Sequence, residues 1–283
     1  MEGATRRFAC TQCGKCCDRS PEVELSEAAS LADVFVFRLM FRLYSLPKTP
    51  GGGHSAVFYE RKRLLSAHAA RTYPTRYVRD GKRMDHNNYL MISALAVDAG
   101  RGACRALKGN RCSIYERRPL GCRTVPFHYS RPEASAERDL ARFVSTPEYE
   151  CDTGPAAPIV IGDGGVVEEA TKGVRSEALA LANADRPWKE AIVRGMKTGS
   201  AHAASLPTLT DIEANASFGA LTSSMRVGWE IAVEAGLMNE ADCRALLRQQ
   251  VEAINCALAE VTTTEDYQTL REMGAEYRHA LAA

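Results

Sequence analysis

Apolar residues recur every three or four positions through most of the second half of the chain, a spacing typical of amphipathic helices. Pro187 suits the first turn of a helix, and Asp211 and Asn239 are suitable N-cap residues. This half is therefore predicted to be helical after a hairpin at 158–167. The expected helices are 168–184, 187–197, 211–235, 239–261 and 265–282.

The first half has a less regular pattern. The apolar stripe in 26–44 predicts a helix with Ser26 as its N-cap. The run 89–97 is short, apolar and bounded by polar turn residues, which favours a buried strand. Three further elements are expected: a helix over 59–72, a hairpin that turns at Gly109-Asn110 between Leu107 and Cys112, and one helical turn over 113–118.

These elements predict an α+β fold that is mostly helical. Residues 1–155 are expected to form a small, irregular, cysteine-rich metal-binding module with a few short strands. Residues 156–283 are expected to form an all-α domain whose role the sequence does not indicate. The glycine-rich turn at 162–165 lacks the sequence of the known phosphate-binding loops, so a plain turn is preferred over a nucleotide site.

The composition is that of a folded globular protein, with 45% hydrophobic and 25% charged residues in a chain of 283. The first residues do not resemble a signal peptide. The most apolar segment, 31–46, is interrupted by Asp33, Arg38 and Arg42, which disfavours a membrane span. We therefore expect a cytoplasmic protein without a membrane partner, in which clustered cysteines indicate metal binding or catalysis.

The charge is unevenly distributed. Residues 1–150 contain 25 lysines and arginines against 16 acidic residues, and the remaining residues contain 11 against 19. Nearby arginines lower the pKa of thiols and so stabilise thiolates. Nucleic-acid binding would also produce a basic half, but the arginines are scattered and no known nucleic-acid module accompanies them. A nucleic-acid partner is therefore not expected.

Four cysteines fall within eight residues near the N-terminus, in the stretch F-A-C-T-Q-C-G-K-C-C-D at 8–18. Thiolates separated by two residues can converge on one ion or cluster, as in zinc knuckles and iron–sulfur loops. Side chains of consecutive residues usually diverge, so the adjacent pair suits two atoms of a cluster, or two separate sites. The four predicted metal ligands are Cys10, Cys13, Cys16 and Cys17.

A second group of cysteines has longer spacings, beginning with gaps of seven and nine residues. These gaps are too long for one knuckle, so the fold must bring the thiols to the first group. A local loop with three ligands generally needs a remote fourth, and we expect one centre that combines both groups. The second group comprises Cys104, Cys112, Cys122 and Cys151.

The two blocks in this order resemble the CxxCxxCC family, the YkgJ-type cysteine-cluster proteins described as zinc- or iron-chelating. The resemblance covers about 8–155 and includes C-x7-C-S-I-Y-E-R-R-P-x2-C-R-x2-P-F in the second block. It implies that the eight cysteines above are the eight of the family. Members are described as iron–sulfur oxidoreductases or as zinc-binding proteins. The flagellin lysine N-methylases share the pattern and are linked to a 4Fe-4S cluster.

Other polar side chains are candidates for supporting roles. Arg117 and Arg123 are predicted to bind the cofactor by hydrogen-bonding thiolates or sulfides, as is Arg118, with a salt bridge to Glu116 as the alternative. His128 is the best histidine candidate for a ligand. The side chains expected elsewhere are His54, His68 and His86 on the polar surface, and Tyr115 and Phe127 in the core.

The last two cysteines are not expected to bind metal. Cys243 and Cys256 lie thirteen residues apart on one expected helix, about 20 Å at the helical rise, too far for one ion. Cys243 belongs to an apolar stripe and is expected in the core, with Cys256 partly buried beside it.

Three functional classes fit the sequence. The adjacent cysteines and the eight thiols favour an iron–sulfur cluster, of the 4Fe-4S type, over zinc as the cofactor, although all-cysteine ligation suits both. The preferred function is electron transfer or an oxidoreductase activity, with a redox or protein partner. The alternatives are a cluster-containing enzyme like the lysine N-methylases, which the resemblance implies, and a non-catalytic zinc module.

Overall fold

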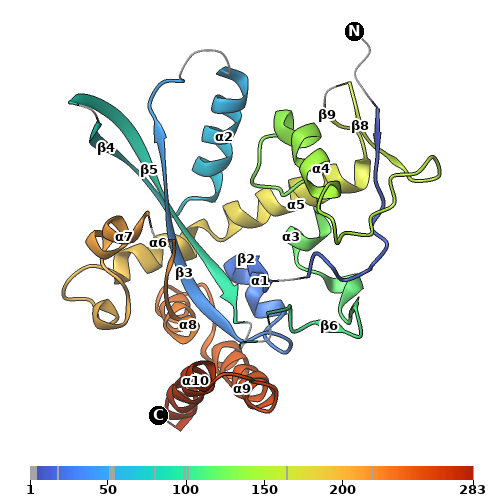
Figure 1. Ribbon diagram of the computed structural model, residues 1–283. Coiled ribbons are helices and arrows are strands. Elements are labelled where there is room, and N and C mark those ends of the chain that lie inside the picture. Colours follow the sequence, from blue (N-terminus) through green and yellow to red (C-terminus); the bar gives the residue numbers. More distant parts are fainter. Residues whose placement is uncertain are drawn as a thin grey trace.

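A computed structural model describes residues 5–17, 19–50, 55–79, 81–97, 100, 102–163, 165–217 and 219–282. Its centre is an antiparallel sheet built on two long strands, β3 (Phe37–Pro47) and β5 (Lys82–Ala96), which pair from Phe37↔Ala96 to Pro47↔His86 (Figure 1). β10 (Leu221–Ser224) pairs with the other edge of β3. The strands on the other edge of β5 are β2 (Glu22–Val23) and β4 (Arg71–Arg79).

The helix predicted over 26–44 is wrong. α1 (Leu25–Ser30) has only six residues, and the chain continues into β3. Within β3 the buried Leu39 and Phe41 lie on one face, and the half-buried Arg38 and Arg42 lie on the other face on either side of the buried Met40, which follows the two-residue period of a strand. The same apolar residues also fit a helical stripe, and the pairing with β5 decides in favour of the strand.

The strand predicted over 89–97 is confirmed as the second part of β5, which begins earlier, at Lys82. The helix predicted over 59–72 corresponds to α2 (Ser55–His68), but the chain leaves the helix before Arg71 to form β4. The β-branched and aromatic residues in 71–78 favour this strand, which gains its hydrogen bonds by pairing with β5.

The second half is predominantly helical, as predicted. Asn239 is confirmed as the N-cap of α9, because its side chain accepts a hydrogen bond from the Asp242 N–H. Pro187 lies in the first turn of α6. No helix in the described part of the chain is long and apolar enough to cross a membrane. The helices that match are α5 (Glu169–Ala184), α6 (Arg186–Gly195), α9 (Glu240–Leu258) and α10 (Thr264–Ala282).

The single helix predicted over 211–235 is wrong. The chain forms α7 (Leu209–Asn215), then β10, then α8 (Met225–Glu234). The N-cap of α7 is Thr208, and Asp211 completes a capping box three residues later. Thr222 suits a strand, and residues 221–224 gain their hydrogen bonds by pairing with 38–41 of β3.

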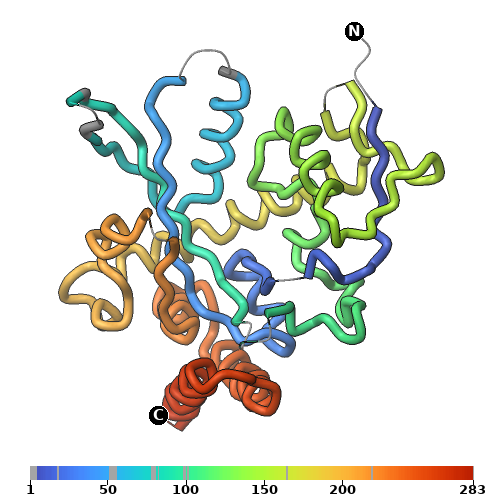
Figure 2. Tube along the Cα trace, viewed as in Figure 1, coloured from blue at the N-terminus to red at the C-terminus, as the bar shows by residue number. Residues whose placement is uncertain are grey.

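The segments that carry the cysteines have short elements, as predicted. The hairpin between Leu107 and Cys112 and the hairpin in 158–167 are both confirmed, and 113–118 contain one 3-10 turn. Figure 2 shows the N-terminal segment beside the second hairpin, far from α9 and α10. The short elements of these segments are β1 (Arg6–Arg7), β6 (Leu107–Lys108), β7 (Arg111–Cys112), η1 (Tyr115–Arg117), α3 (Leu120–Arg123), η2 (Glu133–Ser135), α4 (Ala136–Val144), β8 (Ile159–Gly162) and β9 (Gly165–Val166). One further 3-10 turn, η3 (Ala203–Ser205), lies between α6 and α7.

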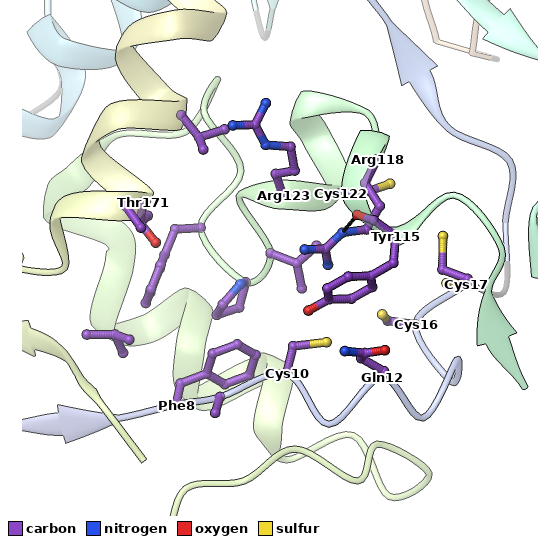
Figure 3. A pocket seen from close by; sticks show the side chains of 18 of the residues that line it. Phe8, Cys10, Gln12, Cys16, Cys17, Tyr115, Arg118, Cys122, Arg123 and Thr171 are labelled. Atoms are coloured by element: carbon purple, nitrogen blue, oxygen red, sulfur yellow. Dashed lines mark hydrogen bonds between the residues drawn. The ribbon is translucent and has the colours of Figure 1, made fainter. Parts of the chain in front are cut away.

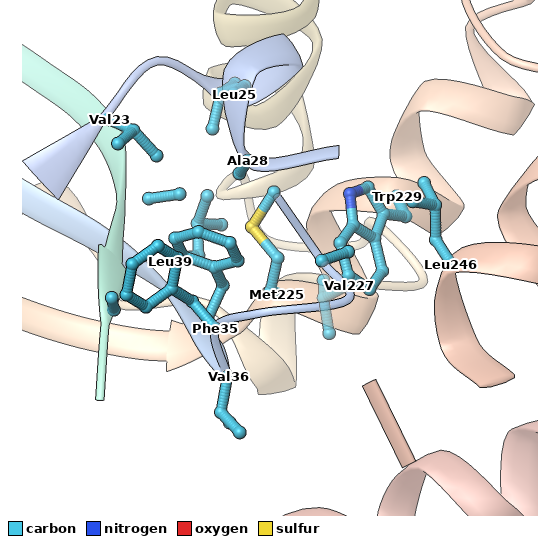
Figure 4. Close-up of a cluster of buried hydrophobic side chains, with 14 of the residues drawn as sticks. Val23, Leu25, Ala28, Phe35, Val36, Leu39, Met225, Val227, Trp229 and Leu246 are labelled. Carbon is cyan, nitrogen blue, oxygen red and sulfur yellow. The ribbon is translucent and has the colours of Figure 1, made fainter. Parts of the chain in front are cut away.

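One apolar core contains residues from both sides of the domain boundary expected at 155. Phe35 and Leu39 pack with Met225 and Trp229, which α8 supplies (Figure 4). The side chain of Gln250, fully buried on α9, forms hydrogen bonds with residues on the other side of this boundary. Its amide accepts a hydrogen bond from the Phe37 N–H at 2.8 Å, and donates to the carbonyls of Ala32 and Phe35 at 2.9 and 2.7 Å.

A buried ionic cluster holds α1, α2 and α6 together. The Lys189 ammonium lies 2.5 Å from one oxygen of Glu24, and Nδ1 of His68 lies 2.9 Å from the other. Burial alone would raise the pKa of Glu24, but the hydrogen bond from His68 and the charge of Lys189 hold this pKa below its ordinary value. His68, expected on the surface, is 3% exposed because it belongs to this cluster.

Replacing Lys189 by methionine is expected to destabilise the protein by about 3–5 kcal/mol, since it leaves the Glu24 carboxylate buried without its cation. Urea unfolding followed by circular dichroism measures this loss. The double variant Glu24→Gln/Lys189→Met removes both charges and should recover most of the stability. A double variant no more stable than Lys189→Met would show that the charge pair is not the cause.

Candidate metal centre

The first cysteine block forms a tight loop with two residues in the left-handed region. Gln12 has φ 61° and Gly14 has φ 74°, and the Cys17 N–H donates to the Gly14 carbonyl at 3.0 Å. The loop lies against the turn of the β6–β7 hairpin. A Cβ at Gly14 would lie 2.5 Å from the Asn110 carbonyl oxygen and 2.7 Å from Leu107. The sequence therefore needs glycine here for both the turn and the close approach.

Backbone hydrogen bonds dock the second block onto the loop at two places. The Cys104 N–H donates to the Cys17 carbonyl at 3.0 Å, which puts these two cysteines side by side. At the other end, Ala9 and Asp152 exchange hydrogen bonds at 2.8 and 3.1 Å. That bridge brings Cys10 next to the segment that carries Cys151.

Cys122 reaches the site from α3, a helix of four residues that is anchored to α1. The carboxylate of Glu27 accepts a hydrogen bond from the Leu120 N–H at 2.6 Å, at the start of α3. Burial raises the pKa of Glu27 to about 7. This contact was not expected from the sequence, because nothing in a lone glutamate of α1 indicates a partner 93 positions away.

Thiols from both blocks line one cavity of about 780 Å³. Figure 3 shows Cys10, Cys16, Cys17 and Cys122 at its edge, around Tyr115. Tyr115 was expected in the core but lies on the cavity wall, half-buried. The cysteines that line the cavity are Cys10, Cys16, Cys17, Cys104, Cys112 and Cys122.

Five of these thiols influence one another's protonation. Burial raises the pKa of Cys122 to about 12, with further contributions from Cys104, Cys112 and Cys16. The pKa of Cys17 is also raised, first by its hydrogen bond with Cys16, then by burial and by the charges of Cys104 and Cys122. A metal ion that binds here must displace protons from these thiols, so binding strengthens as the pH rises.

The remaining thiols form a second group at the other end of the loop. Burial raises the pKa of Cys151 to about 11, and the charges of Cys13 and Cys10 raise it further. Cys13 lines a separate small cleft and differs from its neighbours. Burial opposes ionisation of Cys13, but hydrogen bonds with the backbone of Lys15 and Glu150 lower its pKa below the ordinary value.

The donor set fits a thiolate-ligated metal. Zinc and iron–sulfur clusters both prefer cysteine thiolates, and here six thiols face one cavity. As the side chains stand, no three histidine, cysteine or carboxylate groups in the described residues form a site that could hold an ion. Ligand sets of this kind commonly close only when metal binds, because metal binding and local folding are coupled.

The predicted arginines differ in where they lie. Arg123 lines the cavity and forms an ion pair with Glu177 at 3.1 Å. Arg117 forms an ion pair with Asp33 at 2.5 Å and is not among the residues that line the cavity. Arg118 lines the cavity and lies over the ring of Tyr115. Phe127 is buried beside this wall, as expected.

The histidines of the described segments are not among the residues that line the cavity. Nδ1 of His128 lies 2.8 Å from the Ser130 hydroxyl, and its ring stacks on Tyr129 at 4.4 Å. His86 is half-buried on β5 and hydrogen-bonds Ser45. His54 lies outside the described residues.

The two cysteines of α9 also lie away from the cavity. Cys243 is buried in the core, as expected, and burial raises its pKa to about 11. Cys256 is exposed, so the expectation that it is partly buried is wrong. The buried face of α9 includes Ile254 and Ala257, whereas Cys256 lies on the solvent-exposed face of the helix.

A family model named CxxCxxCC, described as "Putative zinc- or iron-chelating domain", matches residues 9–152, slightly more than half of the chain. The chain belongs to the CxxCxxCC family. The matched range contains the eight cysteines of both blocks, so membership supports the binding of zinc or iron. A search of curated proteins and a search of solved structures each found no significant match.

Gly14→Ala is expected to lower the metal content of the CxxCxxCC domain, because the new Cβ pushes the loop away from Asn110. Metal analysis after anaerobic reconstitution measures this. The matched control is Gly109→Ala, which also has positive φ, 52°, but has no atom within 4 Å of the new Cβ. Equal losses in the two variants would mean that backbone strain, and not the loop–hairpin contact, is responsible.

Acid should destabilise the protein through His128. Burial lowers the pKa of His128 from 6.5 to about 4. Between these values the unfolded state binds a proton that the folded state does not, so stability falls as the pH decreases, by at most about 3 kcal/mol. Urea unfolding at pH 7.5 and 4.5 should show a smaller decrease for His128→Gln than for the wild type. An unchanged difference between the two pH values would contradict this assignment.

Proposed function

We propose that the chain is an iron–sulfur protein that acts in electron transfer or as an oxidoreductase. The observation that carries the proposal is that six thiols, contributed by both cysteine blocks, line one cavity. A single tetrahedral ion uses four ligands, and the thiols present exceed that number. A 4Fe-4S cluster also uses four thiolates, but it distributes them over four iron atoms, which accommodates the adjacent Cys16 and Cys17 better than a single ion does.

The openness of the site also favours a functional metal over a structural one. Structural zinc sites are closed four-coordinate cages, whereas these thiols face a cavity large enough for a small molecule. When bound, an iron–sulfur cluster supplies one-electron chemistry at a potential set by hydrogen bonds and burial. The apolar Phe8 and Phe127 limit water at one side of the cavity, and the Arg123–Glu177 pair borders another.

All eight family cysteines are proposed as ligands in the bound state. Cys17 and Cys104 are held together by a backbone hydrogen bond, and Cys112 follows Cys104 through the β6–β7 hairpin. Cys17, Cys104 and Cys112, together with Cys16 and Cys122, form the centre of the proposed site. Cys10, Cys13 and Cys151 lie at the other end of the loop, and they would complete the cluster or hold a second metal.

Two alternatives have some support. The all-thiol donor set suits zinc as well as iron, and a zinc-binding interaction module would need no redox partner. A cluster-containing enzyme like the lysine N-methylases would use the cavity for a substrate. We propose a cytoplasmic location, because all ten cysteines are free. The proposed partner is a redox protein, because electron transfer requires one.

Purification without oxygen tests the cofactor. The expected result is a brown protein with broad visible absorption, in which iron and acid-labile sulfide occur in comparable amounts. A colourless protein that contains zinc and no sulfide would overturn the iron–sulfur proposal and support the zinc module.

Single substitutions test the ligand set. Cys13→Ser and Cys122→Ser, one from each block, are each expected to lower the metal bound per chain, because each removes a thiolate. The control is the double variant Cys243→Ala/Cys256→Ala, whose sites on α9 lie away from the cavity. Full metal content in both serine variants would contradict the proposed centre.

A further inference from the structure

The cavity extends well beyond the thiols. Its volume of about 780 Å³ lies in the range of cavities that bind small organic ligands, which is about 300–1,000 Å³. The wall away from the thiols is mostly apolar. It includes Phe8, Val125, Phe127, Val160 and Val174. These side chains can bury the hydrocarbon part of a ligand. Glu168, Thr171 and Glu177 also line the cavity, where Glu168 accepts a hydrogen bond from the Thr171 hydroxyl and Glu177 pairs with Arg123.

Arg118 stands between the thiols and the apolar wall. Its Nε donates to the Tyr115 carbonyl at 2.8 Å, and its guanidinium carbon lies 3.5 Å from the centre of the Tyr115 ring. Figure 3 shows this side chain beside Tyr115, with Cys16 and Cys122 nearby. The guanidinium is therefore held in one orientation from two sides, which reduces the entropy lost when it binds a ligand.

No carboxylate neutralises Arg118 within the described part of the chain. The two arginines nearest in sequence behave differently, since Arg117 pairs with Asp33 and Arg123 pairs with Glu177. The terminal nitrogens of Arg118 have no hydrogen-bond partner among the described residues, while Nε is occupied by Tyr115. A fixed guanidinium on the wall of a cavity is suited to an anionic ligand.

We propose that this cavity binds a small organic carboxylate, with its head on Arg118 and its apolar body on the wall formed by Phe8, Phe127 and Val174. Among the described residues, three arginines line the cavity, Arg19, Arg118 and Arg123, and Arg123 is paired with Glu177. The head is assigned to Arg118 because its guanidinium is held in one orientation against Tyr115, and a single fixed guanidinium matches the single charge of a carboxylate. A phosphate group commonly has several donors, such as a helix N-terminus or a backbone nest, in addition to an arginine. The inference rests on the proposed function only in placing the ligand beside the metal.

Binding of hexanoate to the protein as purified tests this proposal, with affinity measured by ligand-observed NMR. Hexanoate has both the carboxylate and an apolar chain. The comparison ligands are 1-hexanol, which has the chain without the charge, and acetate, which has the carboxylate without the chain. Hexanoate should bind on the order of tenfold or more tightly than either, because a charge-assisted hydrogen bond and the buried chain are each worth at least that factor. Equal binding of hexanoate and 1-hexanol, or no binding of hexanoate, would overturn the proposal.

Substitutions locate the head group. Arg118→Gln should weaken hexanoate binding on the order of tenfold, and Arg118→Lys should weaken it less, because lysine keeps the charge and loses the planar fork. The matched control is Arg117→Gln, whose arginine pairs with Asp33 outside the cavity and should leave binding unchanged. Unchanged binding in a folded Arg118→Gln protein would overturn the assignment.

The hexanoate experiment can fail or succeed independently of the test for an iron–sulfur cluster. A protein that proves to contain no iron but binds hexanoate through Arg118 would overturn the proposed function and support this inference. A brown, iron-loaded protein that does not bind hexanoate would overturn this inference alone.

Discussion

The short helix α1 and the residue before it fix the parts of the molecule relative to one another. Glu24 is paired with Lys189 of α6 and with His68 of α2, all three buried. The Ser26 N–H donates to the Asp185 carboxylate at 3.0 Å, at the start of α6. Glu27 accepts from the first N–H of α3. Buried charges need such partners, so these contacts define one arrangement of four helices.

The cysteine site follows from this arrangement. α3 carries Cys122 and is positioned through α1, while the loop of the first block is positioned by its contact with the β6–β7 hairpin and by the Ala9–Asp152 bridge. The helices and the central sheet bury their own apolar faces and share one core. The thiol segments have few long elements, so we attribute their order to these contacts and to the metal we propose.

The sequence indicated the family and several local elements, but not the contacts between distant segments. The cysteine blocks indicated the family correctly, and the turn at Gly109-Asn110 and the cap at Asn239 are local signals that each predicted their feature correctly. β3 was mistaken for a helix because its apolar residues fit both periods and its strand partner lies some 50 positions away. The Glu24–Lys189 pair and the position of Arg118 depend on contacts between distant segments, which no local pattern indicates.

Hydrogen exchange on the metal-loaded and the chelated protein tests most directly whether one metal centre joins the two cysteine blocks. The account predicts that chelation exposes the amides of Cys17 and Cys104 together, because the Cys17 N–H donates within the loop to the Gly14 carbonyl and the Cys104 N–H donates across the blocks to the Cys17 carbonyl. The amides of β3 and α9, which belong to the shared core, should keep their protection. Unchanged exchange at Cys17 and Cys104, or equal loss throughout α9, would contradict the account.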